Sequence, residues 1–197
     1  MASNRHLGRI ITLQSLYEYE CRTRAGDATA EIDSIIAKNI EPYSKALGDT
    51  EFVYQLARGV AANFEPLDEA LRPLAPEWPI DTIAPIDRNV LRIGLYELTR
   101  ADVPPKVAIN EAVELAKAFG SDNSSRFING VLGTAYRQLQ EEESAEQATS
   151  EPVSTTPDTT VDSVAPATES ADTEGNHEQS SMAAEPGSVA GPEPAEQ

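Results

Sequence analysis

Two arginines near the amino terminus have the spacing of a binding surface. Arg5, Arg9 and Thr12 stand at positions i, i+4 and i+7, so a helix would place them on one face. The opposite, core-facing side is expected to carry Leu7, Ile11 and Leu16. Arginines on an exposed face can neutralise phosphates, and such contacts make binding depend on salt. On spacing alone, an ordinary solvated helix face explains the same pattern and is the favoured interpretation.

A second candidate is the turn at residues 121–126 together with the aromatic residue that follows it. Backbone N–H groups at the start of a helix can hold a phosphate, and Phe127 could stack on a nucleobase. The alternative is that Phe127 and Ile128 belong to the core, with Gly130 and Gly133 allowing close helix packing. Residue chemistry alone favours the core for Ile128.

Acidic residues offer a weaker case for catalysis. Glu111 and Glu114 are three residues apart on an expected helix, and Glu97 and Asn110 are further polar candidates. The chain has two histidines, and neither lies near these residues in the sequence. Glu114 can simply pair with Lys117 at i+3. We therefore expect no catalytic residues, no metal site and no cofactor, and a protein that is not an enzyme.

Charge is distributed very unevenly along the chain. It has 33 acidic and 15 basic residues, for a formal net charge of −18. Residues 141–197 hold 14 of the acidic residues and no Lys or Arg, which leaves 19 acidic and 15 basic residues in 1–140. The terminal segment lacks Trp, Tyr, Phe, Leu and Ile, so it cannot bury enough apolar surface to offset ordering. The sequence predicts one domain at 1–140 and a disordered acidic tail, rich in Pro, Ala, Ser, Thr and Glu, at 141–197.

The remaining composition bears on the compartment. Cys21 is the single cysteine, so the chain cannot form an internal disulfide. The first residues lead into an amphipathic segment without the apolar core of a signal peptide, and no apolar run is long enough to span a bilayer. These features favour a cytoplasmic protein.

The elements that would position these residues are helices. Apolar residues recur at helical spacing, without the sustained alternation typical of strands, so the expected fold class is all-α with about seven helices. Helices are expected near residues 7–24, 27–40, 49–64, 66–74, 85–98, 107–119 and 121–139. Asp27 and Asp49 are expected to cap the second and third helices, and Gly120 to end the sixth. Three prolines between residues 73 and 79 predict a connector between two helical halves, at about 1–76 and 77–140.

Three blocks of the sequence resemble those of the NusB family of bacterial transcription antitermination factors. They are residues 85–98 (PIDRNVLRIGLYEL), 107–117 (VAINEAVELAK) and 127–132 (FINGVL). Residues 13–17 (LQSLY) are similar to a further family block, but the preceding stretch is poorer in arginine than the family usually shows. The resemblance covers residues 1–140 and implies a NusB-like fold of two packed helical subdomains.

The resemblance also implies a function. Members of the family bind single-stranded boxA-type RNA together with NusE, a protein of the small ribosomal subunit. With other Nus factors they help RNA polymerase resist termination, notably in ribosomal RNA operons. For this chain we accordingly expect RNA binding that depends steeply on salt and is tightened by NusE.

Residue roles follow from the resemblance position by position. RNA contacts are expected at Arg5, His6, Arg9, Gln14, Asn123, Arg126 and Phe127. Contacts with NusE are expected at Tyr17 and Asp87, although Tyr17 could be a border core residue and Asp87 a helix-dipole group. Asn123 stands where relatives can carry an acid, and a neutral amide should repel phosphate less.

Two other functions stay open. The thinned arginine run is compatible with a helical protein-interaction adaptor, or with a homodimer that has little RNA binding. A remote alternative is an RNA-targeting domain related to that of an RNA cytosine methyltransferase, although nothing after residue 140 could form the catalytic part. The tail is expected to be a solubilising extension, and a tethered polyanion that competes with RNA is the alternative.

Overall fold

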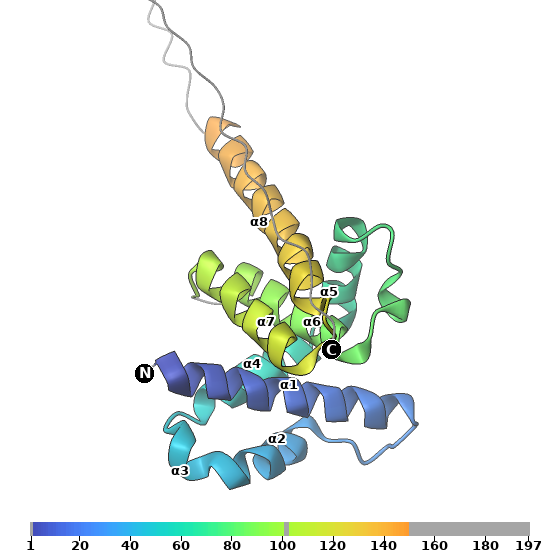
Figure 1. Cartoon of the computed structure of the whole chain (residues 1–197), viewed down its shortest axis with the longest axis vertical. Coiled ribbons are helices and arrows are strands. Elements are labelled where there is room, and N and C mark those ends of the chain that lie inside the picture. The colour runs from blue at the N-terminus through green and yellow to red at the C-terminus, as the bar shows by residue number, and fades with distance from the viewer. Residues whose placement is uncertain (1, 101–102, 150–197) are drawn as a thin grey trace, which may run out of the picture. The chain divides into compact units, whose positions relative to one another are not determined.

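The structure of the chain, a computed structural model, describes residues 2–100 and 103–149. Within these ranges it contains eight α-helices, three 3₁₀ helices and no strand (Figure 1), so the all-α prediction is confirmed. The elements are α1 (Ala2–Arg24), α2 (Ile32–Ile40), η1 (Glu41–Tyr43), α3 (Ser44–Leu47), α4 (Glu51–Ala61), α5 (Phe64–Leu71), η2 (Arg72–Leu74), η3 (Ile80–Thr82), α6 (Pro85–Arg100), α7 (Pro105–Phe119) and α8 (Ser124–Thr149).

Local chemistry explains most helix boundaries. Pro85 and Pro105 occupy the first positions of α6 and α7, where a missing N–H costs nothing. Gly48 turns the chain into α4 with a φ of 70°, which favours glycine. The N-cap position of α4 is Thr50. Asp49, one residue before it, provides the expected capping bond, because its Oδ1 accepts a hydrogen bond from the Phe52 N–H at 3.3 Å.

The expected cap at Asp27 is wrong. Helix α2 begins at Ile32, and Asp27 instead closes the loop before it. Its carboxylate accepts hydrogen bonds from the Thr29 hydroxyl at 2.7 Å, from Arg22 Nε at 2.7 Å and from the Thr29 N–H at 2.9 Å. These bonds, those from Thr29 first, lower the pKa of Asp27 to about 2.

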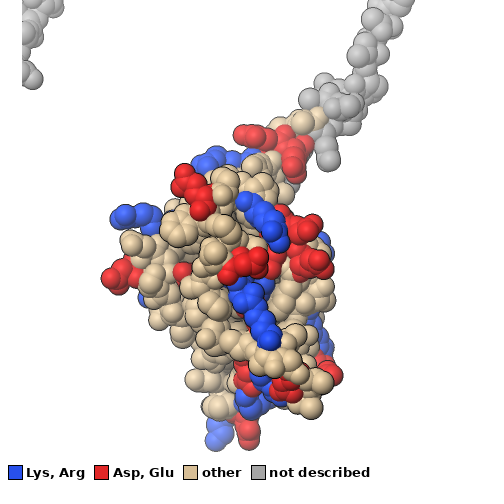
Figure 2. Space-filling view, turned by 90° about the vertical axis from the view of Figure 1, so that its right-hand side faces the viewer, with Lys and Arg blue, Asp and Glu red and all other residues tan. Residues whose placement is uncertain are grey.

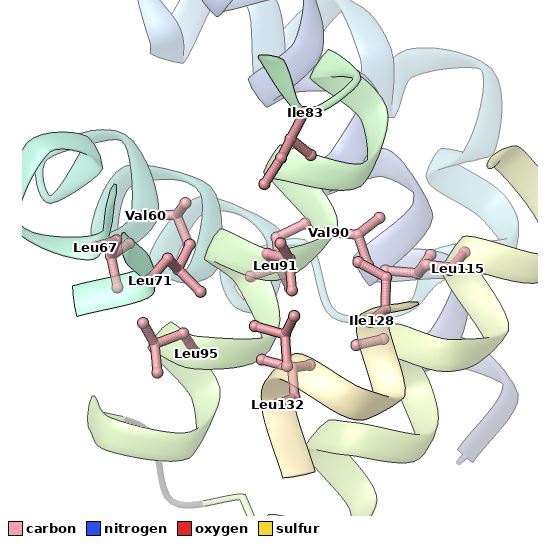
Figure 3. Packing of buried hydrophobic residues seen from close by; sticks show 14 of the residues in the cluster. Val60, Leu67, Leu71, Ile83, Val90, Leu91, Leu95, Leu115, Ile128 and Leu132 are labelled. Carbon is pink, nitrogen blue, oxygen red and sulfur yellow. The ribbon is translucent and has the colours of Figure 1, made fainter. Parts of the chain in front are cut away.

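The main hydrophobic core joins α1, α4, α5, α6, α7 and α8. Figure 3 shows its centre, where Leu91 and Leu95 of α6 lie near Leu71 of α5 and Leu132 of α8. Helix α6 contributes ten buried residues and is the deeply buried helix that its apolar pattern predicts. The core takes residues from both sides of the proline-rich connector at residues 73–79, so the two expected halves share it.

Helix α1 lies between two layers. Its Leu13 and Leu16 enter the main core, while Ile11 packs into a second cluster with α2, α3 and α4 (Figure 1). Because helices cover it on more than one side, the expected solvated face is wrong at two positions. Arg9 is 3% exposed and Thr12 is fully buried.

The glycines of α8 also differ from expectation. A Cβ at Gly130 or Gly133 would meet no atom within 4 Å, so neither residue is needed for close packing. The close approach between α6 and α8 lies at Gly94 of α6, where a Cβ would overlap Leu132. At Gly120 a Cβ would stand 2.5 Å from Ser124 Cβ, so sterics explain this glycine.

Helix α8 continues to Thr149, nine residues past the expected domain boundary at 140. The rest of the expected tail falls at residues 150–197, outside the described residues, and the division of the chain at 140 stays a prediction. No helix of the part that the structure describes is both long and apolar enough to cross a membrane.

Candidate functional site

Arg9 is held by a buried carboxylate. Its guanidinium binds Glu97 of α6 through Nε, at 2.9 and 3.1 Å from the two carboxylate oxygens, and through Nη2 at 2.8 Å. The Glu97 side chain is 1% exposed and that of Arg9 is 4% exposed. Such a bidentate pair fixes the geometry of both groups. Arg9 therefore joins α1 to α6, and its charge is neutralised where it lies.

His6 and Glu111 extend this ion pair towards the surface. His6 Nδ1 lies 2.8 Å from Glu111 Oε2, and Arg9 Nη1 lies 3.5 Å from the same oxygen. Glu97 and Glu111 were candidates for a carboxylate site, and the structure gives both of them basic partners on α1. Glu114, the third acid, pairs with Lys117 at 2.7 Å as expected.

Arg5 presents its charge to solvent. Its side chain is 56% exposed, and its guanidinium carbon lies 4.5 Å from the centre of the Phe52 ring. A weak ion pair joins it to Asp49 at 3.8 Å. Stacking on Phe52 orients the guanidinium while leaving it accessible, so Arg5 is better placed than Arg9 to meet a phosphate.

Gln14 and Tyr17 line a shallow hollow of about 300 Å³. Ile86 at the start of α6 and Phe119 at the end of α7 form its apolar part. Tyr17 is 39% exposed and Phe119 is equally so. The neighbouring Cys21 raises the pKa of Tyr17 above its ordinary value. A tyrosine hydroxyl is protonated at neutral pH and can donate a hydrogen bond. An exposed aromatic pair beside an amide is a surface suited to a protein partner.

Asp87 lies in a different hollow, between α6 and α8. It is 9% exposed, and its Oδ2 accepts a hydrogen bond from the Ser124 hydroxyl at 2.8 Å. Its Oδ1 is buried and has no hydrogen-bond partner among the described residues. Asn123 and Phe127 line the same hollow. Asp87 thus joins the start of α6 to the start of α8.

Arg126 lines a wider groove on the other side of Phe127. The groove has a volume of about 670 Å³ and runs between the connector and α8, past Gly130 and Thr134. Arg126 is exposed, and among the described residues no ion pair engages it. The groove therefore offers a free cation beside an aromatic ring.

Trp78 is a residue of this region that the sequence interpretation did not select. It is 58% exposed and lines both the smaller hollow and the groove. Its ring and that of Phe127 meet nearly edge to face, with centroids 6.2 Å apart. The signal in the sequence was a large aromatic residue alone among three prolines, where no apolar helix face requires one.

A buried ion network holds the connector that carries Trp78. Arg88 donates to the backbone oxygens of Ile80 at 3.1 Å and Ile83 at 3.3 Å, and to Glu20 of α1 at 2.8 Å. Burial raises the pKa of Glu20, but Arg92, the Asn89 amide and Arg88 together outweigh it, and the pKa stays below its ordinary value. The wall of the hollow is thereby fixed to α1 and α6.

The structure thus regroups the candidate residues. Gln14, expected at RNA, lies with Tyr17, and Asp87, expected at the protein partner, lies with Asn123 and Phe127. Basic and acidic side chains are interspersed over the face seen in Figure 2, without a broad basic area. Among the described residues, no group of His, Cys, Asp and Glu could hold a metal ion.

Comparison with known proteins identifies relatives. Residues 6–137 match the NusB family. The chain is similar to the transcription antitermination protein NusB of Chloroflexus aggregans, with 42% identity over 151 residues that cover 75% of this chain and 97% of the relative. Its structure is similar to that of T. maritima NusB, with a TM-score of 0.60, 29% identity, and coverage of 72% of this chain and 96% of that one. It also resembles a chain in a crystal structure of the antitermination factors NusB and NusE with double-stranded RNA, with a TM-score of 0.61, 22% identity, and coverage of 70% and 99%.

Proposed function

The chain belongs to the NusB family, and on this premise we propose that it is a transcription antitermination factor that binds single-stranded boxA-type RNA together with NusE. In this role it acts in the cytoplasm, without enzymatic activity, and helps RNA polymerase resist termination, notably in ribosomal RNA operons. The observation that carries the proposal is the family match across residues 6–137, which includes every element described above except the first residues of α1 and the end of α8.

The exposed candidates support RNA binding at two places. Arg5 on its Phe52 platform can contact a phosphate near the start of α1. Arg126 and Phe127 can contact a phosphate and a base at the start of α8. Arg9 has a structural role beneath this surface, since its charge is already paired with Glu97. We therefore revise the expected salt dependence from steep to moderate, because fewer cations are free to release counterions.

NusE is proposed to bind over the hollow of Tyr17, Ile86 and Phe119. This surface is lined by residues of α1, α2, α6 and α7, and Gln14 could contact RNA held between the two proteins. Asp87, the other expected partner contact, is buried beside Ser124 and is proposed to act indirectly, by holding α6 against α8.

Fluorescence anisotropy with labelled RNA tests the proposal. A boxA-type RNA should bind this protein in the presence of NusE more tightly than a scrambled RNA of equal length, and more tightly than without NusE. Tyr17→Asp should abolish the gain from NusE while leaving the binding of RNA alone unchanged. Equal affinity for boxA and scrambled RNA with NusE present would contradict the proposed function.

The burial of Arg9 favours the alternative of an adaptor or homodimer with little RNA binding, and this alternative has its own test. With Arg9 paired to Glu97 and His6 to Glu111, the basic run at the start of α1 is reduced to Arg5, which suits a helical adaptor or a homodimer with little RNA binding. Sedimentation of the purified protein over a range of concentrations would reveal a dimer. An adaptor should retain NusE binding in the variant Arg5→Ala/Arg126→Ala, whereas the proposed factor should lose RNA affinity in it.

A further inference from the structure

Two hollows of the surface share one aromatic wall. The smaller hollow has a volume of about 220 Å³ and lies between the connector and the starts of α6 and α8. The wider groove continues along α8 on the other side. Trp78, Asn123 and Phe127 line both of them. A ligand that bends over this wall could therefore occupy both spaces at once.

The wall has an exposed aromatic ring available for stacking. Trp78 is 58% exposed, and Phe127 contacts it nearly edge to face at an interplanar angle of 63°. An exposed tryptophan leaves a large apolar surface in water, which is typical of binding surfaces. Every nucleobase has a π-face that can stack on such a ring.

Charge assigns the two spaces to different parts of a nucleotide. The smaller hollow is lined by the carboxylate of Asp87, which opposes a phosphate there and favours the amino-bearing edge of a base over a carbonyl edge. The groove is lined on its α8 side by Arg126, whose cation suits a phosphate, and on its connector side by the carboxylate of Glu77. A base in the hollow, with a backbone that follows the α8 side of the groove, keeps the phosphates beside Arg126 and away from Asp87 and Glu77.

We propose that the smaller hollow receives one nucleobase of the bound RNA, stacked on Trp78, while the sugar–phosphate backbone passes along the groove beside Arg126. This inference rests on the proposed function and adds to it a binding position for a single base, here called the base seat, with Trp78 as the residue on which the base stacks. The hollow is preorganised, because Arg88 holds the backbone oxygens of Ile80 and Ile83 on one of its sides.

Trp78 is the single tryptophan of the chain, so its emission reports directly on this wall. The full chain is titrated with unlabelled boxA-type RNA, with and without NusE, and the signal of a Trp78→Phe protein is subtracted. A second series replaces each base of the RNA in turn by the fluorescent base 2-aminopurine. We expect RNA to quench Trp78, and one position of the RNA to lose its 2-aminopurine emission on binding.

Variants separate stacking from folding. Trp78→Ala should weaken RNA binding about 5- to 100-fold and restore the 2-aminopurine emission at that one position, whereas Trp78→Phe should keep most of the affinity. The turn should survive both changes, because Trp78 uses its backbone N–H to bind the Ala75 oxygen at 3.0 Å. Tyr43→Ala is the matched control, since Tyr43 is also exposed, at 38%, and lines neither hollow.

The possible failures are distinguishable. If boxA-type RNA binds tightly but leaves Trp78 emission unchanged, and Trp78→Ala binds equally well, the base seat is wrong and the proposed function stands. If NusE alone quenches Trp78 and RNA adds nothing, the wall belongs to the protein partner and the base seat is again wrong. If no RNA binds even with NusE, both the seat and the proposed function fail.

Discussion

The buried carboxylate of Glu20 binds three polar side chains, those of Arg88, Asn89 and Arg92. Arg88 and Arg92 bind its Oε1 at 2.8 and 3.1 Å, and Asn89 donates to its Oε2 at 2.8 Å. Removing the charge of one member of a buried ion network leaves buried charge uncompensated, at a cost of about 3 to 5 kcal/mol. The stability of the domain should therefore depend on this residue more than on any exposed ion pair.

The first prediction concerns the charge of Glu20. Glu20→Gln should lower the free energy of unfolding by about 3 kcal/mol at pH 7, since Arg88 loses its carboxylate partner and Arg92 keeps only Asp68. The folded pKa of Glu20 lies below its unfolded value, so its contribution is present above the unfolded pKa and is lost as the pH falls through the folded pKa. Urea denaturation from pH 7 to pH 3 should show the wild type approaching the variant on acidification. A constant difference across this range would contradict the assignment.

The second prediction separates the two arginines of α1. Arg9→Ala should destabilise the fold by about 3 to 5 kcal/mol, because it leaves Glu97 buried and unpaired. Arg5→Ala should leave the melting temperature nearly unchanged and reduce the salt slope of RNA binding by about 0.7, the value for one phosphate contact on a single strand. Calorimetry and anisotropy at several salt concentrations measure these effects.

A double variant provides the control for this pair. Arg9→Met/Glu97→Leu removes both charges, so it should be less destabilised than Arg9→Ala. If Arg9→Ala instead keeps full stability and loses RNA affinity, Arg9 contacts RNA directly and its pairing with Glu97 does not matter for folding.

At the scale of single residues, the sequence did not predict which side chains of α1 are buried. The spacing of Arg5, Arg9 and Thr12 placed them on one face, and the structure agrees with that geometry. Spacing could not reveal that α6 and α7 cover part of this face, because only the packing of helices remote in sequence decides it. The roles of Arg9 and Glu97 therefore could not be assigned from the sequence.

At the scale of elements, helix positions were largely predictable. Strong apolar periodicity and flanking prolines located α6 and α7 closely, since both signals are local. The start of α2 was missed by five residues, because Asp27 bonds Thr29 and Arg22 in a loop rather than capping a helix. The hollow beside Trp78 depends on the fold of an irregular connector, which has no periodicity to interpret.

The third prediction uses the glycines of two helices. Gly133 is inside α8, and a Cβ there meets nothing within 4 Å, so Gly133→Ala should stabilise the protein by about 1 kcal/mol. Gly94→Ala should destabilise it, because the added methyl group overlaps Leu132. Thermal denaturation of both variants checks the contrast. A stabilised Gly94→Ala would show that α6 and α8 pack less closely than described.

At the scale of the whole molecule, the formal net charge of −18 does not represent the charge of the helical domain. Residues 1–140 hold 19 acidic and 15 basic residues, and several of these are paired across helices. The proposed boundary between domain and tail separates this nearly balanced part from the strongly acidic remainder.

The fourth prediction addresses residues 150–197. All residues of both hydrophobic clusters lie before residue 136, so a chain ending at Thr149 should keep the melting temperature of the full protein. If the segment is a solubilising extension, the shortened chain should also bind boxA-type RNA with unchanged affinity at 50 mM and at 200 mM salt. Tighter binding by the shortened chain at the lower salt would instead support a competing polyanion.

Burying Arg9 against Glu97 also affects how quickly RNA can arrive. Charges that cancel at contact create little potential beyond a Debye length, about 8 Å at physiological ionic strength, so they do not steer a distant polyanion. Encounter should then proceed at an ordinary rate of about 10⁵ to 10⁶ M⁻¹s⁻¹ and change little with salt. Selectivity between RNA sequences would then lie in the dissociation rate of each complex. A second protein that closes over the RNA would have its largest effect on this rate, by lengthening the residence time of the RNA.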